Sequence, residues 1–474
     1  MKKKWLLIAA LASMATMLYS CSDNAGDEIR SELAPVADRV AETDYISLLS
    51  NERYDGYNFR IFARSGQLSD QYLEEDTGDV VTSAVYKRNK FVEERYGITI
   101  TGTESSSGNY ETDALNSILA GDDAYDIIFP HSRAAFTYAL QDAAYNINDI
   151  EAIDLDKPYW SKDLRNSFEV NGKMYFLDGD ITTHRLSHAM CLNFNKRIFD
   201  ELGFEYPYEM VKEGEWTFDE FAYLAKKGGA DLNGDGVMDP AYDRYGFFDS
   251  DWFGPIQIIY TGGQKIYNKN EDGEIELTLY NNKTVDIFSE YFSLMENDNC
   301  FLRLSDISPY TGNLFKEGRA MMAYSSLGFA SEYRAMEDDF GIIPWPKFSE
   351  EDDYASIVNA YAHVGIIPIT VSDTERTGTI VEALCAYGSE YVIPAFYEVS
   401  LKTKNTRDDN SEEMIDIIKD SIIYYIGYVS RGPFESAGNA ISRRGKNEFS
   451  SFYSGLAGSA EVHVKELNES FGEY

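Results

Sequence analysis

An acidic loop in the middle of the sequence has the composition of a calcium site. The predicted ligands are the side chains of Asp231, Asn233, Asp235, Asp239 and Asp243 and the backbone carbonyl of Val237. Oxygen donors at alternating positions suit Ca2+, and Gly236 stands where such loops turn sharply.

This loop departs from the calcium pattern at its end. Tyr242 stands where a bidentate Glu is expected, and Asp243, one residue later, is the predicted substitute. The alternative is a solvated turn of Asp, Asn and Gly without metal. A metal would fix the segment before Tyr245, so its predicted role is structural.

A second set of polar residues follows two predicted strands. Arg64 and Ser65 come directly after the first strand, and His131, Ser132 and Arg133 follow the third. Because loops at the carboxyl ends of parallel strands face a crevice, these side chains are predicted ligand contacts. Arg and hydroxyl groups suit sugar hydroxyls or carboxylates, although surface loops also collect such residues.

Several common catalytic signals are absent from the sequence. It contains no G-x-S-x-G elbow, no P-loop and no G-x-G-x-x-G turn. His184 and His188 have helical i, i+4 spacing, but Arg185 stands where a zinc protease needs its Glu. A hydrolase with two carboxylates remains an alternative, because the chain has 80 Asp and Glu residues.

The elements that must position these residues alternate between strand and helix. Strands are expected at 57–63, 98–101 and 125–129, with helices at 80–96 and 111–119 between them. This order is the opening of a parallel α/β sheet.

Further elements are expected along the rest of the chain. A helix should begin at Thr217, whose side chain would cap it with Glu220. Later strands are predicted at 175–177, 190–194, 320–324, 340–343 and 364–369, and helices at 377–387, 390–399 and 411–425.

Charge and cysteine content narrow the class of protein. The net charge of −38 disfavours nucleic acid and anionic lipid headgroups as partners. Cys191, Cys300 and Cys385 are widely spaced and form neither a disulfide framework nor a zinc motif. Buried thiols are the expectation, and one disulfide among the three is the alternative.

The first 21 residues have the layout of a secretion signal. Three lysines precede a short apolar run at 5–18, and Ser20 is followed by Cys21. This segment resembles a bacterial lipoprotein signal, in which the cysteine receives acyl chains such as palmitate. Residues 1–20 are therefore the predicted signal, Cys21 the predicted membrane anchor, and the polar residues 21–54 a flexible tether.

Six segments in order resemble the extracellular solute-binding proteins of bacterial carbohydrate ABC transporters. They are Leu-Ala-Gly-Asp to Asp-Ile-Ile at 119–128, Asn-Gly-Lys-Met-Tyr at 171–175, Leu-Asn-Phe-Asn-Lys at 192–196, Gly-Glu-Trp-Thr-Phe-Asp-Glu-Phe at 214–221, Phe-Lys-Glu-Gly-Arg-Ala-Met-Met at 315–322 and Phe-Gly-Ile-Ile-Pro-Trp-Pro at 340–346.

The resemblance implies a two-lobed, periplasmic-binding-protein-like α/β fold. Each lobe would be a mixed, mostly parallel sheet flanked by helices, with a hinge of about three crossings. The first lobe would hold 55–183 plus 365–400, and the second 184–364 plus 401–474. The crossings would fall near 181–185, 363–366 and 400–406. The implied protein is an extracytoplasmic, lipid-anchored monomer and not an enzyme, which passes an oligosaccharide or related solute to an ABC permease.

The same resemblance implies further ligand contacts and an alternative cargo. Trp252 and Phe253 would present aromatic faces to a sugar, and Ser325, Ser326 and Tyr361 would contribute from the second lobe and its hinge. Trp216 and Trp345 lie within the framework segments and are expected to pack in the core. A peptide or another small solute as cargo is the alternative on the same fold.

Overall fold

The computed structural model describes residues 44–105, 112–250, 254–296, 300–303, 313–333, 335–397, 409–435 and 447–472. Contacts divide the chain into two units, Met1–Tyr45 and Ile46–Tyr474. Everything below concerns the second unit. Among the described residues, no helix combines the length and the apolar character needed to cross a membrane.

A three-stranded parallel sheet forms the first α/β layer. Its order is β2-β1-β3, with β1 at Asn58–Ala63, β2 at Thr99–Glu104 and β3 at Ile127–Phe129. The crossover helices are α2 (Val80–Tyr96) and α3 (Asp113–Leu119). The predicted strand–helix alternation of this region is therefore confirmed.

Local chemistry sets both ends of α2. The Asp79 side chain accepts hydrogen bonds from the backbone N–H groups of Val81 and Thr82, which caps the first turn. The helix ends at Gly97, whose φ of 70° lies in the left-handed region that glycine adopts without strain.

The second sheet has five strands in the order β10-β4-β9-β5-β8. Its strands are β4 (Met190–Asn195), β5 (Tyr245–Asp249), β8 (Phe301–Arg303), β9 (Ala320–Ser326) and β10 (Phe340–Ile343). β4 runs antiparallel to β9 and β10, whereas β5 is parallel to β8 and β9. This sheet is mixed in equal parts rather than mostly parallel, because β4 runs against both of its neighbours.

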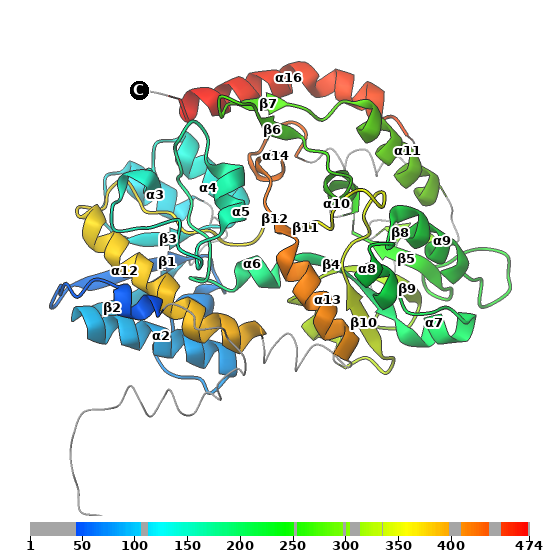
Figure 1. Cartoon of the computed structure of the whole chain (residues 1–474), viewed down its shortest axis with the longest axis horizontal. Helices are drawn as coiled ribbons and strands as arrows, with labels where there is room; N and C mark the ends of the chain where they lie inside the picture. Colours follow the sequence, from blue (N-terminus) through cyan, green and yellow to red (C-terminus); the bar gives the residue numbers. More distant parts are fainter. Residues whose placement is uncertain are drawn as a thin grey trace, which may run out of the picture. The chain divides into compact units, whose positions relative to one another are not determined.

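The remaining elements surround and connect the two sheets (Figure 1). The helices are η1 (Tyr45–Leu48), η2 (Leu68–Asp70), α4 (Ser132–Leu140), η3 (Ile147–Asp149), α5 (Lys162–Phe168), α6 (His184–Ser187), α7 (Lys196–Leu202), α8 (Tyr208–Glu213), α9 (Phe218–Gly228), α10 (Gly254–Thr261), α11 (Asn282–Met295), η5 (Phe329–Tyr333), α12 (Thr374–Tyr387), the π-helix η6 (Gly388–Val392), α13 (Asp409–Asp420), α14 (Ile426–Val429) and α16 (Phe449–Ser470). The short strands are β6 (Tyr267–Lys269), β7 (Ile275–Leu277), β11 (Ser356–Ile357) and β12 (Ile422–Ile423).

Several predicted elements differ in the structure. The segments 175–177 and 364–369 do not form extended strands but pair through isolated β-bridges, Leu177 with Gly365 and Ile128 with Ile366. The helix predicted at 411–425 ends at Asp420, because the next residues form β12 alongside β11. The side chain of Thr217 makes no capping hydrogen bond to α9.

The helix predicted at 390–399 is replaced in part by a π-helix. Gly388–Val392 adopts the wider i→i+5 turn directly after α12. Residues 398 and 399 lie outside the described part of the chain.

The C-terminal elements contact both α/β layers. α14 packs on α4, and α16 packs on β7, α11 and α4. α13 lies against α8 and β10 of the second layer. The tail predicted to belong to the second lobe therefore also contacts the first layer, and the lobe boundaries remain predictions.

Two tryptophans and three cysteines that were predicted to be buried lie in the core. Trp216 and Trp345 are almost fully buried, and Trp216 donates its indole N–H to the Pro344 carbonyl at 3.0 Å. Cys191, Cys300 and Cys385 are buried and free, which confirms the expected thiols.

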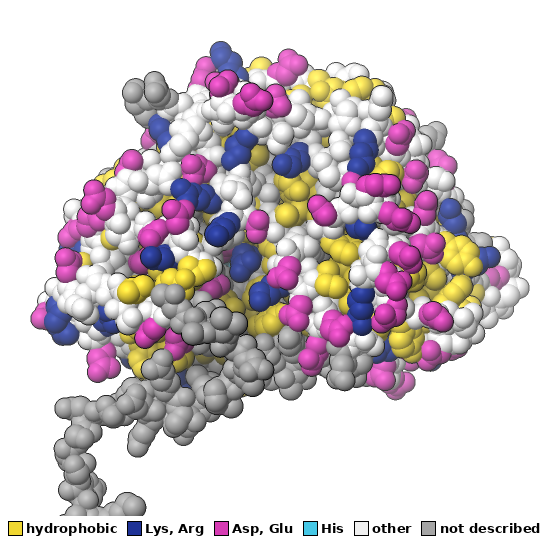
Figure 2. Space-filling model, in the orientation of Figure 1, with side chains coloured by type: hydrophobic (Ala, Val, Ile, Leu, Met, Phe, Trp, Pro, Cys, Tyr) yellow, Lys and Arg dark blue, Asp and Glu magenta, His cyan; other side chains and the backbone are white. Residues whose placement is uncertain are grey.

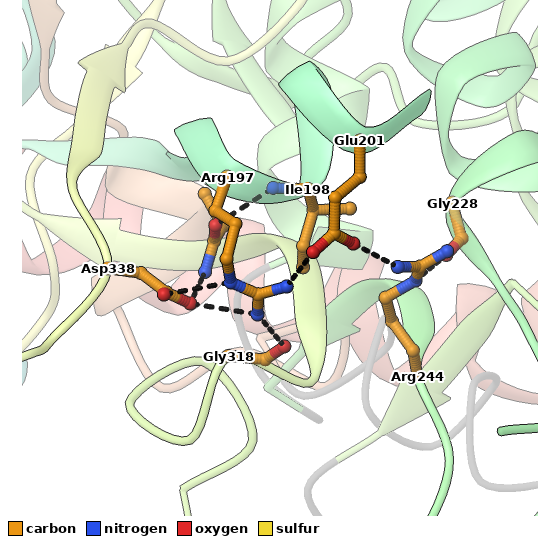
Figure 3. A network of polar contacts seen from close by, with 8 residues as sticks. Arg197, Ile198, Glu201, Gly228, Arg244, Gly318 and Asp338 are labelled. Atoms are coloured by element: carbon orange, nitrogen blue, oxygen red, sulfur yellow. Dashed lines mark hydrogen bonds and ion pairs between the residues drawn. The ribbon is translucent and has the colours of Figure 1, made fainter. Parts of the chain in front are cut away.

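A polar network joins α7 to three loops of the second sheet (Figure 3). Arg197, at the start of α7, forms a two-bond ion pair with Asp338 at 2.8 and 2.9 Å and donates to the Gly318 carbonyl at 3.0 Å. Arg197 also pairs with Glu201, which pairs in turn with Arg244. Arg197 lowers the pKa of Asp338, so the carboxylate stays charged. The network links α7 to the loops that precede β5, β9 and β10.

Candidate ligand-binding site

Arg64 and His131 emerge at the same edge of the first sheet. Ala63 of β1 and Phe129 of β3 are paired in register, and each strand ends there. Arg64 follows β1 directly, and His131 begins α4 just beyond β3. The strand-end positions predicted from the sequence therefore meet in the structure.

Tyr361 lies beside both of these residues. Its ring centroid is 5.5 Å from that of His131, with an edge-on geometry, and the Arg64 Cζ is 5.9 Å from the same ring. The Asn359 side chain accepts the Tyr361 backbone N–H at 3.0 Å, which fixes the local turn. About half of Tyr361 is exposed, 49%, so its ring is open to a ligand.

His131 and Ser132 are buried and hold the backbone together. The His131 Nδ1 accepts the Ala134 N–H at 3.1 Å and caps α4, so the ring proton is on Nε2. The Ser132 hydroxyl donates to the Ala360 carbonyl at 3.0 Å, and its backbone N–H donates to Ala362 at 2.7 Å. These two residues thus position the Tyr361 segment rather than present free polar groups.

Arg133 and the segment after α14 close one side of this region. The guanidinium of Arg133 forms an ion pair with Glu435. Arg431 donates from Nε to the Arg133 carbonyl at 3.2 Å, and its φ of 61° marks a left-handed turn. Ser65, which follows Arg64, is exposed.

Three histidines stack next to the same segment. The ring of His184 lies between those of His188 and His363, at centroid distances of 4.7 and 4.3 Å with nearly parallel planes. His184 Nδ1 accepts the His363 backbone N–H, so Nε2 carries the proton and donates it to Asp70 at 2.7 Å. His363 is bridged in turn to His131.

Burial keeps the outer rings of this stack neutral. Burial, with a smaller contribution from the neighbouring His184, lowers the pKa of His188 to about 3. The same two causes hold the pKa of His363 well below its ordinary range. Neutral rings can stack closely, whereas two added protons would repel each other.

The predicted contacts from the second sheet lie at the end of β9. Ser325 and Ser326 end β9, where Ser325 is buried and its hydroxyl donates to the Ser326 carbonyl at 3.2 Å. Ser326 pairs in register with Met190, close to the His188 segment. Trp252 and Phe253, and also Cys21, lie outside the described residues.

The predicted calcium loop is organised by hydrogen bonds to its own backbone. Asp231 accepts the N–H groups of Gly234 and Gly236, and Asn233 accepts that of Asp235. These bonds lower the pKa of Asp231, Gly236 contributing most. Asp235 accepts the N–H of Val237 at 2.8 Å.

Asp243 closes the same loop from inside. It is fully buried, and its two carboxylate oxygens accept the backbone N–H groups of Leu232 and Asp239, each at 2.8 Å. Asp239 in turn accepts the N–H of Ala241. Among the described residues, no group of three or more His, Cys, Asp or Glu side chains is arranged to hold a metal ion. Calcium binding therefore stays a prediction.

Comparison with known proteins identifies the family. The bacterial extracellular solute-binding protein family matches residues 74–375. The chain belongs to this family. Its members are extracellular solute-binding proteins, and the structure has the α/β fold that they share. No protein with a curated description matches the sequence.

Solved structures of similar fold include several transport receptors. A cyclo/maltodextrin-binding protein complexed with maltotetraose is 13% identical, with a TM-score of 0.58, 89% of this chain covered and 100% of the other. UgpB from Mycobacterium tuberculosis, in complex with glycerophosphocholine, is 15% identical, with a TM-score of 0.57 and coverage of 87% and 99%.

A third similar structure is an ABC substrate-binding protein from Listeria monocytogenes in complex with cycloalternan. It is 15% identical, with a TM-score of 0.52, and the match covers 89% of this chain and 100% of the other. At these identities the likeness concerns the fold.

Sequence reasoning missed the partners that complete the site region. No sequence pattern points to Asp70, His363 or Glu435, and the spacing of His184 and His188 suggests only zinc ligands. The i, i+4 spacing of the two histidines was the available signal, but nothing local indicated that His363 would stack on them.

Proposed function

We propose that the protein is a lipid-anchored, extracytoplasmic receptor that binds a carbohydrate or related solute and delivers it to an ABC transporter permease. Binding occurs in a cleft between two lobes, and the solute leaves chemically unchanged. Family membership supports the receptor role, and the similar structures supply the precedent for sugars.

The observation that carries this proposal is the meeting of Arg64, His131 and Tyr361. An exposed aromatic ring offers a flat face to the C–H side of a pyranose, and the adjacent guanidinium can donate to its hydroxyls. Because the three residues come from separate segments held by buried hydrogen bonds, the ring is positioned before the ligand arrives.

Purification under native conditions, followed by mass spectrometry of the bound small molecules, tests the proposal. We expect an oligosaccharide or glycoside to co-purify, and calorimetry with that compound to give saturable binding that Tyr361→Ala weakens. Chemical conversion of the compound by the purified protein would favour a hydrolase instead. If no sugar in a broad screen bound, the proposal of a carbohydrate ligand would be wrong.

A polar non-sugar solute is the second candidate cargo. UgpB, of similar fold, holds glycerophosphocholine, a phosphodiester without a sugar ring. The Arg64 guanidinium beside Tyr361 suits such an anion as well as a hydroxyl. Calorimetry with glycerophosphodiesters beside neutral oligosaccharides distinguishes the two cargoes.

Anchoring through Cys21 and a monomeric state complete the proposal. Acylation at Cys21 would keep the receptor near its permease. The tether would be shorter than the predicted 21–54, because Tyr45–Leu48 forms η1, Leu49 is buried and the Tyr54 N–H donates to the Tyr96 carbonyl at 2.7 Å. Intact-mass analysis of membrane-extracted protein should show acyl chains on the mature N-terminus, and Cys21→Ala should release the protein from the membrane. Light scattering should give the mass of one chain.

We also propose that the loop at 231–243 binds Ca2+ and that the ion has a structural role. Asp231, Asn233, Asp235, Asp239, Asp243 and the Val237 carbonyl would hold the ion by oxygen ligands. Addition of Ca2+ after chelation should raise the melting temperature of the wild type but not that of Asp231→Ala.

A further inference from the structure

A pocket separate from the Arg64–Tyr361 region opens between three segments of the chain. It has a volume of about 160 Å³, and its walls come from α5, from β6 and from the segment that joins β12 to α14. This volume is well below the roughly 300–1,000 Å³ of pockets for drug-sized ligands, so a ligand would be small. None of the proposed solute contacts lines it.

Two lysines stand on one wall of this pocket. Lys265 is exposed and lies over the Tyr425 ring, 5.9 Å from its centroid. Lys269 is partly buried and donates to the Glu169 carbonyl at 2.9 Å. Within the described part of the chain, neither ammonium forms an ion pair with a carboxylate.

The charge of Lys269 is poorly compensated where it stands. Burial lowers its pKa, Glu169 opposes this effect, and the nearby Lys265 lowers the pKa further by repulsion. The Glu169 carboxylate is already engaged by Arg165 at 2.9 Å. An anion between the two lysines would relieve this repulsion.

The pocket stands out because the chain as a whole is strongly acidic, with a net charge of −38. Figure 2 shows Lys and Arg side chains gathered along the centre of one face, over α5 and β6, beside a strip of hydrophobic side chains. A cleft lined by positive charge raises the local concentration of small anions.

The other walls favour a ligand with hydroxyl groups and a flat or apolar side. Asn166 and Ser167 offer uncharged donors and acceptors, and the Asn268 side chain accepts a hydrogen bond from the Lys265 ammonium at 3.2 Å. Tyr425 is held rigidly because its ring stacks on that of Tyr260 at 3.6 Å. Ile423 and Ile426 complete an apolar wall.

One acidic residue also lines the pocket. Asp163 is exposed, and Arg185 partly offsets its charge. With two lysines against one carboxylate, the lining keeps a net positive charge. Asp163 can accept a hydroxyl hydrogen from a ligand whose carboxylate lies at the lysines.

From this arrangement we infer a second ligand site, at Lys265, Lys269 and Tyr425, that binds a small hydroxylated carboxylate such as a monosaccharide acid. The carboxylate lies between the two ammonium groups, and the ring side of the ligand rests on the tyrosine and isoleucine wall. Because the walls come from three segments distant in sequence, an occupied site ties them together and stabilises the folded chain.

The test uses the full mature chain and a matched pair of probes. D-glucuronate and D-glucose share size and most hydroxyls, but only the first carries a carboxylate. Calorimetry and thermal shift are run at low salt on the wild type, on Lys269→Gln and Lys265→Gln, and on Lys226→Gln, an exposed lysine of α9 outside the pocket. Tyr361→Ala controls for binding at the proposed solute site.

We expect the wild type and Lys226→Gln to bind glucuronate about tenfold more tightly than glucose, and each pocket variant to lose about that factor. Tyr361→Ala should keep the glucuronate binding. Equal binding of glucose, unchanged binding by both pocket variants, or loss in Tyr361→Ala alone would each overturn the second site. If Lys269→Gln does not fold, the result for Lys265→Gln decides whether the second site exists, because the exposed Lys265 side chain can be replaced without disturbing the fold.

Discussion

The loop at 231–243 and the Arg64–Tyr361 region show two ways of building a polar site. In the loop, nearly every carboxylate and amide oxygen accepts an N–H from a residue two to five positions along the chain. In the Arg64–Tyr361 region, the contacting groups come from segments far apart in the sequence and meet through strand register and buried hydrogen bonds. The loop is organised locally, whereas the solute region exists only in the folded chain.

The largest expected effect tests whether the loop is truly self-contained. Asp243→Ala leaves the N–H groups of Leu232 and Asp239 without their buried acceptor, and should lower the free energy of unfolding by about 2–4 kcal/mol. Urea denaturation provides the measurement. The control Asp235→Ala, which removes two exposed local bonds, from the Val237 N–H and the Asn233 amide, should cost less than about 1 kcal/mol. Equal losses for both variants would mean that Asp243 does not close the loop.

The second prediction addresses the solute region. Tyr361→Ala should weaken binding of the co-purified ligand about ten- to hundredfold, because the exposed ring is lost, while Tyr361→Phe keeps most of it. Calorimetry measures both. Stability should change little, since half of the side chain is exposed. An unaltered dissociation constant for the Ala variant would remove Tyr361 from the site.

The third prediction uses the pH dependence of the histidine stack. The pKa of His188 is about 3 in the folded protein, against an ordinary value near 6.5. Between these pH values the unfolded chain binds a proton that the folded chain does not, so stability falls as the pH drops below about 6.5. The slope from this residue is at most about 1.4 kcal/mol per pH unit.

His188→Asn isolates this contribution. The unfolding free energy of the variant should depend less steeply on pH from 6.5 down to 4.5 than that of the wild type. Other titrating groups, among them Asp178, whose pKa burial raises to about 6, remain in both proteins and largely cancel. Parallel pH profiles for the two proteins would show that His188 titrates normally when folded.

The smallest expected effect concerns the framework network. Arg197→Lys keeps the charge but loses the two-bond geometry toward Asp338 and the bond to Gly318, and should lower stability by about 1 kcal/mol. Thermal unfolding gives the shift. Lys212→Gln, which breaks exposed pairs with Glu209 and Glu413, serves as the control and should be close to neutral. A larger loss of stability in Lys212→Gln than in Arg197→Lys would contradict the expectation that the Arg197 network contributes more than exposed ion pairs.

The sequence predicted elements well where the signal is local. α2 spans the predicted residues 80–96, and β10 has the expected bounds 340–343. Prediction failed where pairing with distant residues decided the outcome. Residues 422–423 continue an apolar helical pattern, but they form a strand because β11 offers them a partner.

The same division applies to the candidate site. Its strand-end residues Arg64 and His131 could be predicted, because parallel strands bring their carboxyl ends to one edge. The burial of Ser132, the pairing of Arg133 with Glu435 and the stacking of His363 could not, since each depends on a partner that no local pattern names.

By itself, the sequence determined the strand–helix order of the first sheet, the family and the acidic, glycine-containing composition of the loop. These depend on residues a few positions apart, where periodicity, capping and turn preferences act. Only the tertiary structure decided that Tyr361 lies beside Arg64, that three histidines stack beside Asp70, and that Lys265 and Lys269 share a pocket with Tyr425. Such contacts depend on strand register and packing across the whole fold, which sum many weak interactions that no short segment contains.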